Sequence, residues 1–125
     1  MQNLASEQVE ISGWMDDIRE AYWMSDIFVA PLFTGSGLQN KILEAMACKI
    51  PVVTTSIVNY SLRAEVDKSI SIAENKSEFT QEIMSLLQMS DNEKQRRVDT
   101  AYNFVTKTYS WTENNNVLIK AFQNI

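Results

Sequence analysis

Residues 27–53 read IFVAPLFTGSGLQNKILEAMACKIPVV, and this stretch decides the fold. Ile27–Leu32 is a continuous apolar run, which is typical of a strand covered on both faces of a parallel sheet. A loop with two glycines, Phe33–Asn40, separates it from a helical pattern over Lys41–Cys48, and the β-branched run Val52–Thr55 follows. Strand, helix and strand in this order predict an α/β fold with a parallel sheet.

Weaker patterns of the same kind extend the fold in both directions. Val9–Trp14 alternates as a strand does, and apolar residues at helical spacing follow it, with Asp16 and Asp17 placed for a helix amino terminus. A further short strand is predicted over Ser69–Ala73. Three helices complete the pattern, and their starts are marked by Asn75 with Glu78, by Ser90 with Glu93, and by Thr112. We therefore expect one domain over residues 1–125, with a Rossmann-like parallel sheet of about four strands and flanking helices.

Composition excludes several classes of function. The chain has no histidine and a single cysteine, Cys48, which excludes an internal disulfide, a multi-cysteine metal cage, and the Ser–His and Cys–His nucleophile pairs. A net charge of −5 argues against a nucleic-acid-binding surface, which needs clustered basic residues. No apolar run approaches the roughly 18 residues of a transmembrane segment, and no signal peptide opens the chain. A soluble, cytoplasmic protein is expected, and peripheral attachment of a parent enzyme to the inner face of the membrane is compatible with this.

The loop between the central strand and its helix carries the chemistry. Gly35, Ser36 and Gly37 stand at the carboxyl end of a parallel strand and directly before a helix. Glycines let the backbone approach an anion, and the free N–H groups of a helix start point at it. Lys41 adds a positive charge, and Glu44, one turn into the helix, offers a carboxylate to the vicinal hydroxyls of a ribose. Together these residues indicate a nucleotide site.

Plainer interpretations of the same residues stay open. A Gly-x-Gly turn before a helix is often only a connection between a strand and a helix. Glu44 on a helix is often solvated, or paired with Lys41 three positions earlier. Spacing alone therefore indicates a nucleotide site without establishing one.

Taken together, Ile27–Val53 resembles the donor-site signature of the retaining glycosyltransferases of family four, the group 1 enzymes with the GT-B fold. The matching features are Pro31 at a strand end, the loop Gly35–Gly37, the Glu-Ala-Met-Ala helix segment Glu44–Ala47, and the strand Pro51–Val53. The flanking segments Gly13–Asp17 and Tyr109–Trp111 resemble the family more weakly. The resemblance implies that the chain is most of the C-terminal, nucleotide-sugar-binding domain of such an enzyme.

The resemblance also implies roles for individual residues. Backbone N–H groups around Gly37, Leu38 and Gln39 are implied to meet the donor diphosphate, and Glu44 is implied to bind the ribose. The family is usually metal-independent, so no metal and no cofactor are expected beyond the donor substrate, a UDP-, GDP- or ADP-sugar. No catalytic residue is assigned. The residues implied to border the base or sugar pocket are Pro31 and Phe33.

Three departures from the family pattern matter. Ser36 stands where the family has its first glutamate, and Lys49 stands where it has a glycine. Either Lys49 adopts a positive φ at a cost of about 1 kcal/mol, or the helix ends differently here. The chain is also expected to lack the family's upstream strands and its N-terminal acceptor domain. With those strands gone from a 3-2-1-4-5-6 sheet, Val9–Trp14 is expected to pair directly beside Ile27–Leu32, and an exposed sheet edge is expected to allow a homodimer.

The expected function is donor binding in a hexosyltransferase of the kind used in polysaccharide biosynthesis. Such an enzyme moves a sugar from a nucleoside diphosphate sugar to a glycan or lipid-linked acceptor with retention. Without the N-terminal domain, its partner in the parent enzyme, the chain is expected to be inactive by itself. Two alternatives stay open: a sugar-nucleotide epimerase of related GT-B fold, and a non-catalytic nucleotide-binding α/β module.

Overall fold

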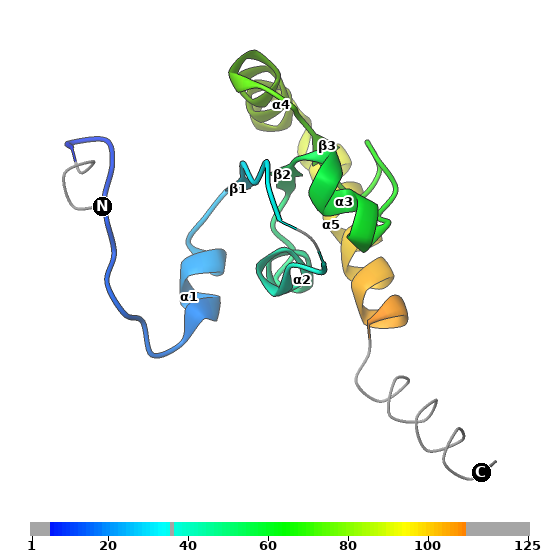
Figure 1. The fold of residues 1–125 in the computed structure, drawn as a ribbon, viewed down its shortest axis with the longest axis horizontal. Helices are drawn as coiled ribbons and strands as arrows, with labels where there is room; N and C mark the ends of the chain where they lie inside the picture. Colours follow the sequence, from blue (N-terminus) through cyan, green and yellow to red (C-terminus); the bar gives the residue numbers. More distant parts are fainter. Residues whose placement is uncertain (1–5, 36, 110–125) are drawn as a thin grey trace, which may run out of the picture.

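A parallel sheet lies at the centre of the computed structural model, which describes residues 6–35 and 37–109. The strands are β1 (Phe28–Ala30), β2 (Val52–Thr54) and β3 (Ser71–Ile72). They pair in chain order, β1-β2-β3, with Phe28 opposite Val52 and Val53 opposite Ser71 (Figure 1). The predicted α/β fold with a parallel, Rossmann-like sheet is confirmed for the part of the chain that the structure describes.

Helices cover both faces of this sheet. Their bounds are α1 Ile18–Trp23, α2 Asn40–Ala47, α3 Ser56–Leu62, α4 Lys76–Gln88 and α5 Asp91–Thr108. In Figure 1, α4 lies above the sheet and α2 lies below it. Successive side chains of β2 show the same division, because Val52 packs in the core cluster with α2, α3 and α5, whereas Val53 packs in the cluster with α4. The described region therefore has three layers, with the sheet in the middle.

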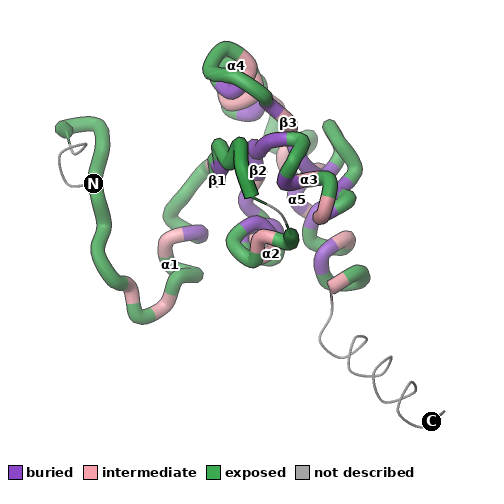
Figure 2. Tube along the Cα trace, viewed as in Figure 1, coloured by how far each residue is buried: buried purple, intermediate pink, exposed green. Residues whose placement is uncertain are grey.

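The core is concentrated around β2 and α2. Val53 is fully buried, and so are Ala45 and Met46 of α2. The apolar run Ile27–Leu32 was expected to be covered on both faces, but Val29 is 40% exposed, because β1 is an edge strand. Figure 2 shows buried residues along β2, β3 and the inner sides of α2 and α5, whereas residues 6–17 are mainly exposed. The central stretch of the sequence thus supplies the middle of the apolar core, and α3, α4 and α5 supply much of the rest.

The expected strand over Val9–Trp14 is wrong. This segment has no ladder pairing with β1 or with any other described strand, and the Trp14 side chain is 92% exposed. A strand is stable only when its backbone N–H and C=O groups are paired, and apolar alternation alone does not provide a partner. The direct pairing expected beside Ile27–Leu32 therefore does not form, and β1 is an edge strand of the described sheet, as is β3.

Helix α3 was not predicted, because its sequence carries little local signal. Asn59, Tyr60 and Ser61 are ordinary or poor helix formers, and the helix has only seven residues. Val58 and Leu62, four residues apart, are both buried in the core, so tertiary packing stabilises this helix. The other predicted helices are confirmed as far as residue 109; the helix expected from Thr112 lies outside the described residues, as do Ser36, Ser110 and Trp111.

Helix starts agree closely with the sequence patterns. The Asn75 side chain accepts a hydrogen bond from the Glu78 N–H at 2.9 Å, and the Ser90 side chain accepts one from the Glu93 N–H at 3.3 Å. Asp17 caps α1 in the same way, and its contact with the Arg19 side chain lowers the pKa of the Asp17 carboxyl. None of the described helices has both the length and the apolar character that a membrane crossing requires.

The end of α2 explains the unusual lysine that follows it. Lys49 has φ 60°, the left-handed conformation that favours glycine. The Ile50 N–H donates to the Ala45 carbonyl at 3.1 Å, and the Lys49 N–H donates to the Met46 carbonyl at 3.1 Å, which is the bond pattern of a Schellman turn. Of the two possibilities left open at Lys49, a positive φ or a different helix end, the structure has the positive φ.

Candidate functional site

The loop between β1 and α2 depends on its two glycines for its backbone path. Gly35 has φ 105° and Gly37 has φ 93°, both in the region that residues with a side chain rarely adopt. A Cβ atom built at either position meets no other atom within 4 Å, so the requirement for glycine comes from the backbone conformation and not from crowding. Space therefore remains beside this loop.

Two buried hydroxyls, one at the end of β2 and one directly after it, fix the start of this loop. The Thr54 hydroxyl donates to the Ala30 carbonyl at 2.8 Å, and the Thr55 hydroxyl donates to the Leu32 carbonyl. Both threonines are fully buried. Because these bonds join the carboxyl ends of two neighbouring strands, the loop leaves the sheet from a fixed point.

The first turn of α2 lies directly after the loop. Gln39 occupies the N-cap position, but its side chain makes no capping hydrogen bond, and the first turn contains no acidic residue. The leading N–H groups of a helix carry partial positive charge and have no partner within the helix. Lys41 lies in the same turn and is exposed. The start of α2 is thus suited to an anion.

Glu44 lies on the same helix, and its carboxylate contacts α1. The side chain is exposed, and its Oε2 atom accepts a hydrogen bond from the Tyr22 hydroxyl at 2.9 Å. Burial, and secondly this hydrogen bond, raise the pKa of Tyr22 to about 12. The phenol therefore stays protonated and remains a donor at neutral pH. The ion pair between Glu44 and Lys41, left open as an alternative, is not formed among the described residues.

A cavity of about 320 Å³ lies between β1 and the first turn of α2. It is lined by Phe28, Val29, Ala30, Pro31, Leu32, Gln39, Lys41 and Ile42. Three of the residues singled out in the sequence, Pro31, Gln39 and Lys41, are therefore brought together here. Glu44 follows Lys41 by three residues on α2 and does not itself line this cavity.

Phe33 is placed differently from Gln39 and Lys41. With Pro31 it lines a second cavity, of about 330 Å³, on the face of the sheet that α4 covers. Its ring meets the Phe79 ring edge to face, with centroids 6.1 Å apart. Leu38 is exposed and lines neither cavity. Pro31 thus borders both cavities, and Phe33 borders only the second.

The family model described as "Glycosyl transferases group 1" matches residues 1–89. This chain belongs to the group 1 glycosyltransferases. The matched range includes the sheet, the glycine loop, α2 and the residues around both cavities. No curated protein and no solved structure matches this glycosyltransferase chain.

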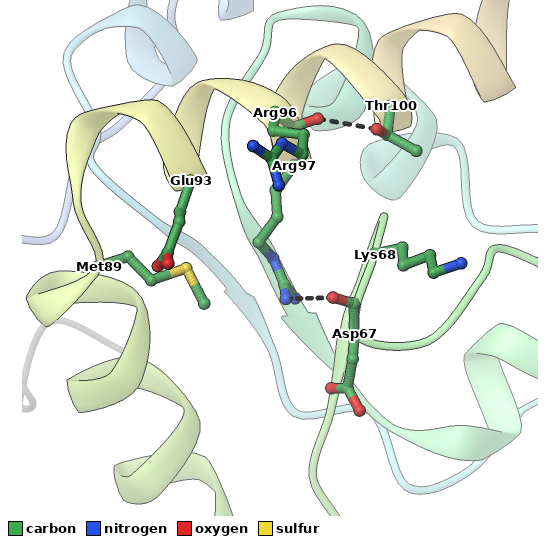
Figure 3. Close-up of a pocket in the computed structure, with 7 residues that line it drawn as sticks. All are labelled: Asp67, Lys68, Met89, Glu93, Arg96, Arg97 and Thr100. Carbon is green, nitrogen blue, oxygen red and sulfur yellow. Dashed lines mark hydrogen bonds between the residues drawn. The ribbon is translucent and has the colours of Figure 1, made fainter.

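A further cavity lies at the end of the sheet opposite to the glycine loop. This cavity, of about 360 Å³, is lined by Asp67, Lys68, Met89, Glu93, Arg96, Arg97 and Thr100 (Figure 3). The Arg97 guanidinium donates to the Asp67 carbonyl and to the Ser71 hydroxyl, each at 2.6 Å. These bonds attach the turn before β3 to α5. Because Asp67 precedes β3, this cavity lies at the amino ends of the parallel strands, away from the loop after β1.

The candidate site also contains residues that the sequence pattern did not single out. Tyr22 belongs to the apolar residues at helical spacing that follow Trp14, and its contact with Glu44 spans 22 residues of chain. Thr54 and Thr55 were noted only as part of a strand. Their roles depend on pairing between elements, and periodicity along the sequence carries no signal for such contacts. In the described ranges, no cluster of three or more acidic, histidine or cysteine side chains could hold a metal ion.

Proposed function

We propose that this chain binds the nucleotide of a nucleoside diphosphate sugar, as the donor-binding part of a retaining hexosyltransferase. Membership of the group 1 glycosyltransferases supports glycosyl transfer over epimerisation. The observation that carries the proposal is the placement of Glu44 one turn behind a glycine loop and an uncapped helix start, beside a cavity of about 320 Å³. A cavity of this size suits part of a nucleotide.

In this proposal the diphosphate lies on the loop and on the start of α2. The diphosphate is surrounded by backbone N–H groups of Gly35, Ser36, Gly37, Leu38 and Gln39. The Lys41 ammonium offsets part of the charge of the diphosphate. The same groups stabilise the diphosphate as it leaves, so the proposal needs no divalent cation. Pro31 and Phe33 border the base or the sugar, and the chain supplies no assigned catalytic residue.

Glu44 binds the ribose in this proposal. A carboxylate has two oxygens with about four lone-pair directions, and it accepts hydrogen bonds from two neighbouring hydroxyls at once. Hydrogen bonds to a charged acceptor are stronger than neutral ones, so this contact contributes both affinity and a preference for a ribose over a sugar without the diol.

Transfer itself needs a second domain in this proposal. Donor and acceptor must be held together in one closed cleft, because positioning the reactants removes most of the entropy cost of the reaction. The acceptor, a glycan or a lipid-linked sugar, is assigned to the N-terminal domain of the parent enzyme. The chain by itself is then a binding unit without transfer activity.

The test is a calorimetric titration of the chain with UDP, GDP and ADP and with the 2′,3′-dideoxy form of whichever binds best. We expect Glu44→Ala to weaken binding of the ribonucleotide about tenfold or more, and to remove the preference over the dideoxy form. Glu65→Ala is the matched control, because Glu65 is an exposed acid paired with Lys68 near the amino end of β3. Equal binding by the wild type and Glu44→Ala would contradict the ribose role.

A further inference from the structure

Tyr22 is held rigidly in the core, although it belongs to a short helix. Its side chain is only 6% exposed, and its ring packs against the Phe28 ring with centroids 5.6 Å apart. Its hydroxyl lies 2.9 Å from Glu44 Oε2 and 3.4 Å from the Lys41 carbonyl. The phenol therefore has a fixed position, set by α1, β1 and α2 together.

Glu44 is the flexible partner in this pair. An exposed glutamate on a helix samples several rotamers, and choosing one of them costs conformational entropy when a ligand binds. The bond from Tyr22 holds the carboxylate at Oε2. Among the described residues no protein group donates to Oε1, so that oxygen and the second lone pair of Oε2 stay free to accept.

The hydroxyl of Tyr22 acts only as a donor toward this carboxylate. Burial and the bond to Glu44 keep its pKa near 12, so the phenol is neutral throughout the range in which proteins are normally studied. An ionised carboxylate accepts hydrogen bonds and does not donate them. The Tyr22 hydroxyl is therefore the donor in this bond and Glu44 Oε2 is the acceptor.

We propose that Tyr22 is a positioning residue, which orients the Glu44 carboxylate so that it accepts a vicinal diol of the bound nucleotide. This inference rests on the proposed ribose-binding role of Glu44. Phe28 packs against the Tyr22 ring and the Lys41 carbonyl lies near the Tyr22 hydroxyl, and both residues line the cavity of about 320 Å³, so the pair stands at the border of that cavity. Tyr22 itself lies behind Glu44 and acts on the ligand through it.

The first test replaces Tyr22 by phenylalanine, which keeps the ring and removes only the hydroxyl. We expect Tyr22→Phe to weaken ribonucleotide binding about three- to tenfold and to leave binding of the 2′,3′-dideoxynucleotide unchanged. In a Glu44→Ala background the same substitution is expected to have no effect on affinity, because the group that it positions is gone.

Tyr109→Phe is the matched control. The Tyr109 hydroxyl donates to the Leu62 carbonyl at 2.8 Å, and its ring packs against Phe104, so this variant loses a comparable bond far from Glu44. It is expected to lower thermal stability without changing the preference for the ribonucleotide. A Tyr22→Phe chain that binds like the wild type, while Glu44→Ala loses the ribose preference, would overturn the inference and leave the proposed function standing. No effect of Glu44→Ala would overturn both.

A second measurement does not depend on nucleotide binding. The pKa of the Tyr22 phenol can be followed by NMR of a chain labelled at the tyrosine Cζ atoms. We expect Glu44→Gln to lower this pKa, because the neutral amide no longer favours the protonated phenol. An unchanged pKa in Glu44→Gln would show that the bond is absent in solution, and the inference would be wrong.

Discussion

Lys49 occupies a backbone conformation that usually belongs to glycine, and the structure shows what offsets the strain. Its ammonium group lies 3.2 Å from the Asp99 carboxylate and 5.0 Å from the centre of the Tyr102 ring. Both partners belong to α5. An exposed ion pair contributes little, and an exposed cation–π contact contributes about 0.5–1 kcal/mol. Together they nearly balance the roughly 1 kcal/mol that a positive φ costs at this position.

This balance leads to a prediction for two variants at one position. Lys49→Ala keeps the strained backbone and loses both contacts with α5, so we expect it to lower the free energy of unfolding by about 1 kcal/mol. Lys49→Gly loses the same contacts but relieves the backbone strain. Its free energy of unfolding is therefore expected to lie within about 0.5 kcal/mol of the wild-type value. Urea denaturation measures both. A glycine variant no more stable than the alanine variant would contradict this account.

Residue-level prediction succeeded where a backbone requirement shows in the sequence. Gly35 and Gly37 indicated a turn between strand and helix, and both adopt positive φ there. The lysine in place of a family glycine indicated either a positive φ at position 49 or a different helix end, and the structure has the positive φ. Tyr22 could not be predicted, because its partner lies 22 residues away on another helix and no local pattern links the two.

At the scale of elements, β2 organises the site. It is buried on both faces, and Thr54 at its end, with Thr55 directly after it, holds the end of β1 through the carbonyls of Ala30 and Leu32. The sequence predicted this strand and its neighbours because apolar and β-branched runs are local signals. It wrongly predicted a strand over Val9–Trp14, because apolar alternation indicates a suitable surface and does not guarantee a partner.

We expect Thr54→Val to lower the free energy of unfolding by about 1 kcal/mol, since valine has the same shape but cannot donate to the Ala30 carbonyl. The matched control is Thr80→Val, because the Thr80 hydroxyl donates to the Lys76 carbonyl on the exposed surface of α4. That control should change stability by less than about 0.5 kcal/mol. Chemical denaturation compares the two, and equal effects would argue against a special role for the buried bond.

At the scale of the whole molecule, the feature of interest is the edge of the sheet formed by β1. Within the described ranges β1 pairs only with β2, so its other side presents unpaired backbone groups. Apolar side chains accompany this edge, with Val29 40% exposed and Phe33 53% exposed. An exposed, apolar strand edge is a template for pairing with a second chain. The homodimer expected from the sequence remains a prediction, and this edge is where we place it.

Self-association is therefore expected to depend on Val29. A lysine there places a charge on the strand edge, and natural proteins use edge lysines to prevent such pairing. We expect Val29→Lys to shift the sedimentation of concentrated samples toward the monomer. Ile57→Lys is the control, because Ile57 is equally exposed but lies on α3. If the wild-type chain stays monomeric at high concentration, the predicted homodimer does not exist. If both variants reduce association equally, the dimer contact does not lie at the edge of β1.

The packing of α5 on α2 has a consequence for synthesis. Ala101 and Val105 of α5 share one core cluster with Ala45 and Met46 of α2. A ribosome makes the glycine loop and α2 well before it makes the helix that covers them, so the apolar side of α2 lacks this cover in the nascent chain. Release of α5 from the exit tunnel is then the event that completes the hydrophobic surroundings of the loop, and a pause in translation before it would lengthen the time in which chaperones can bind.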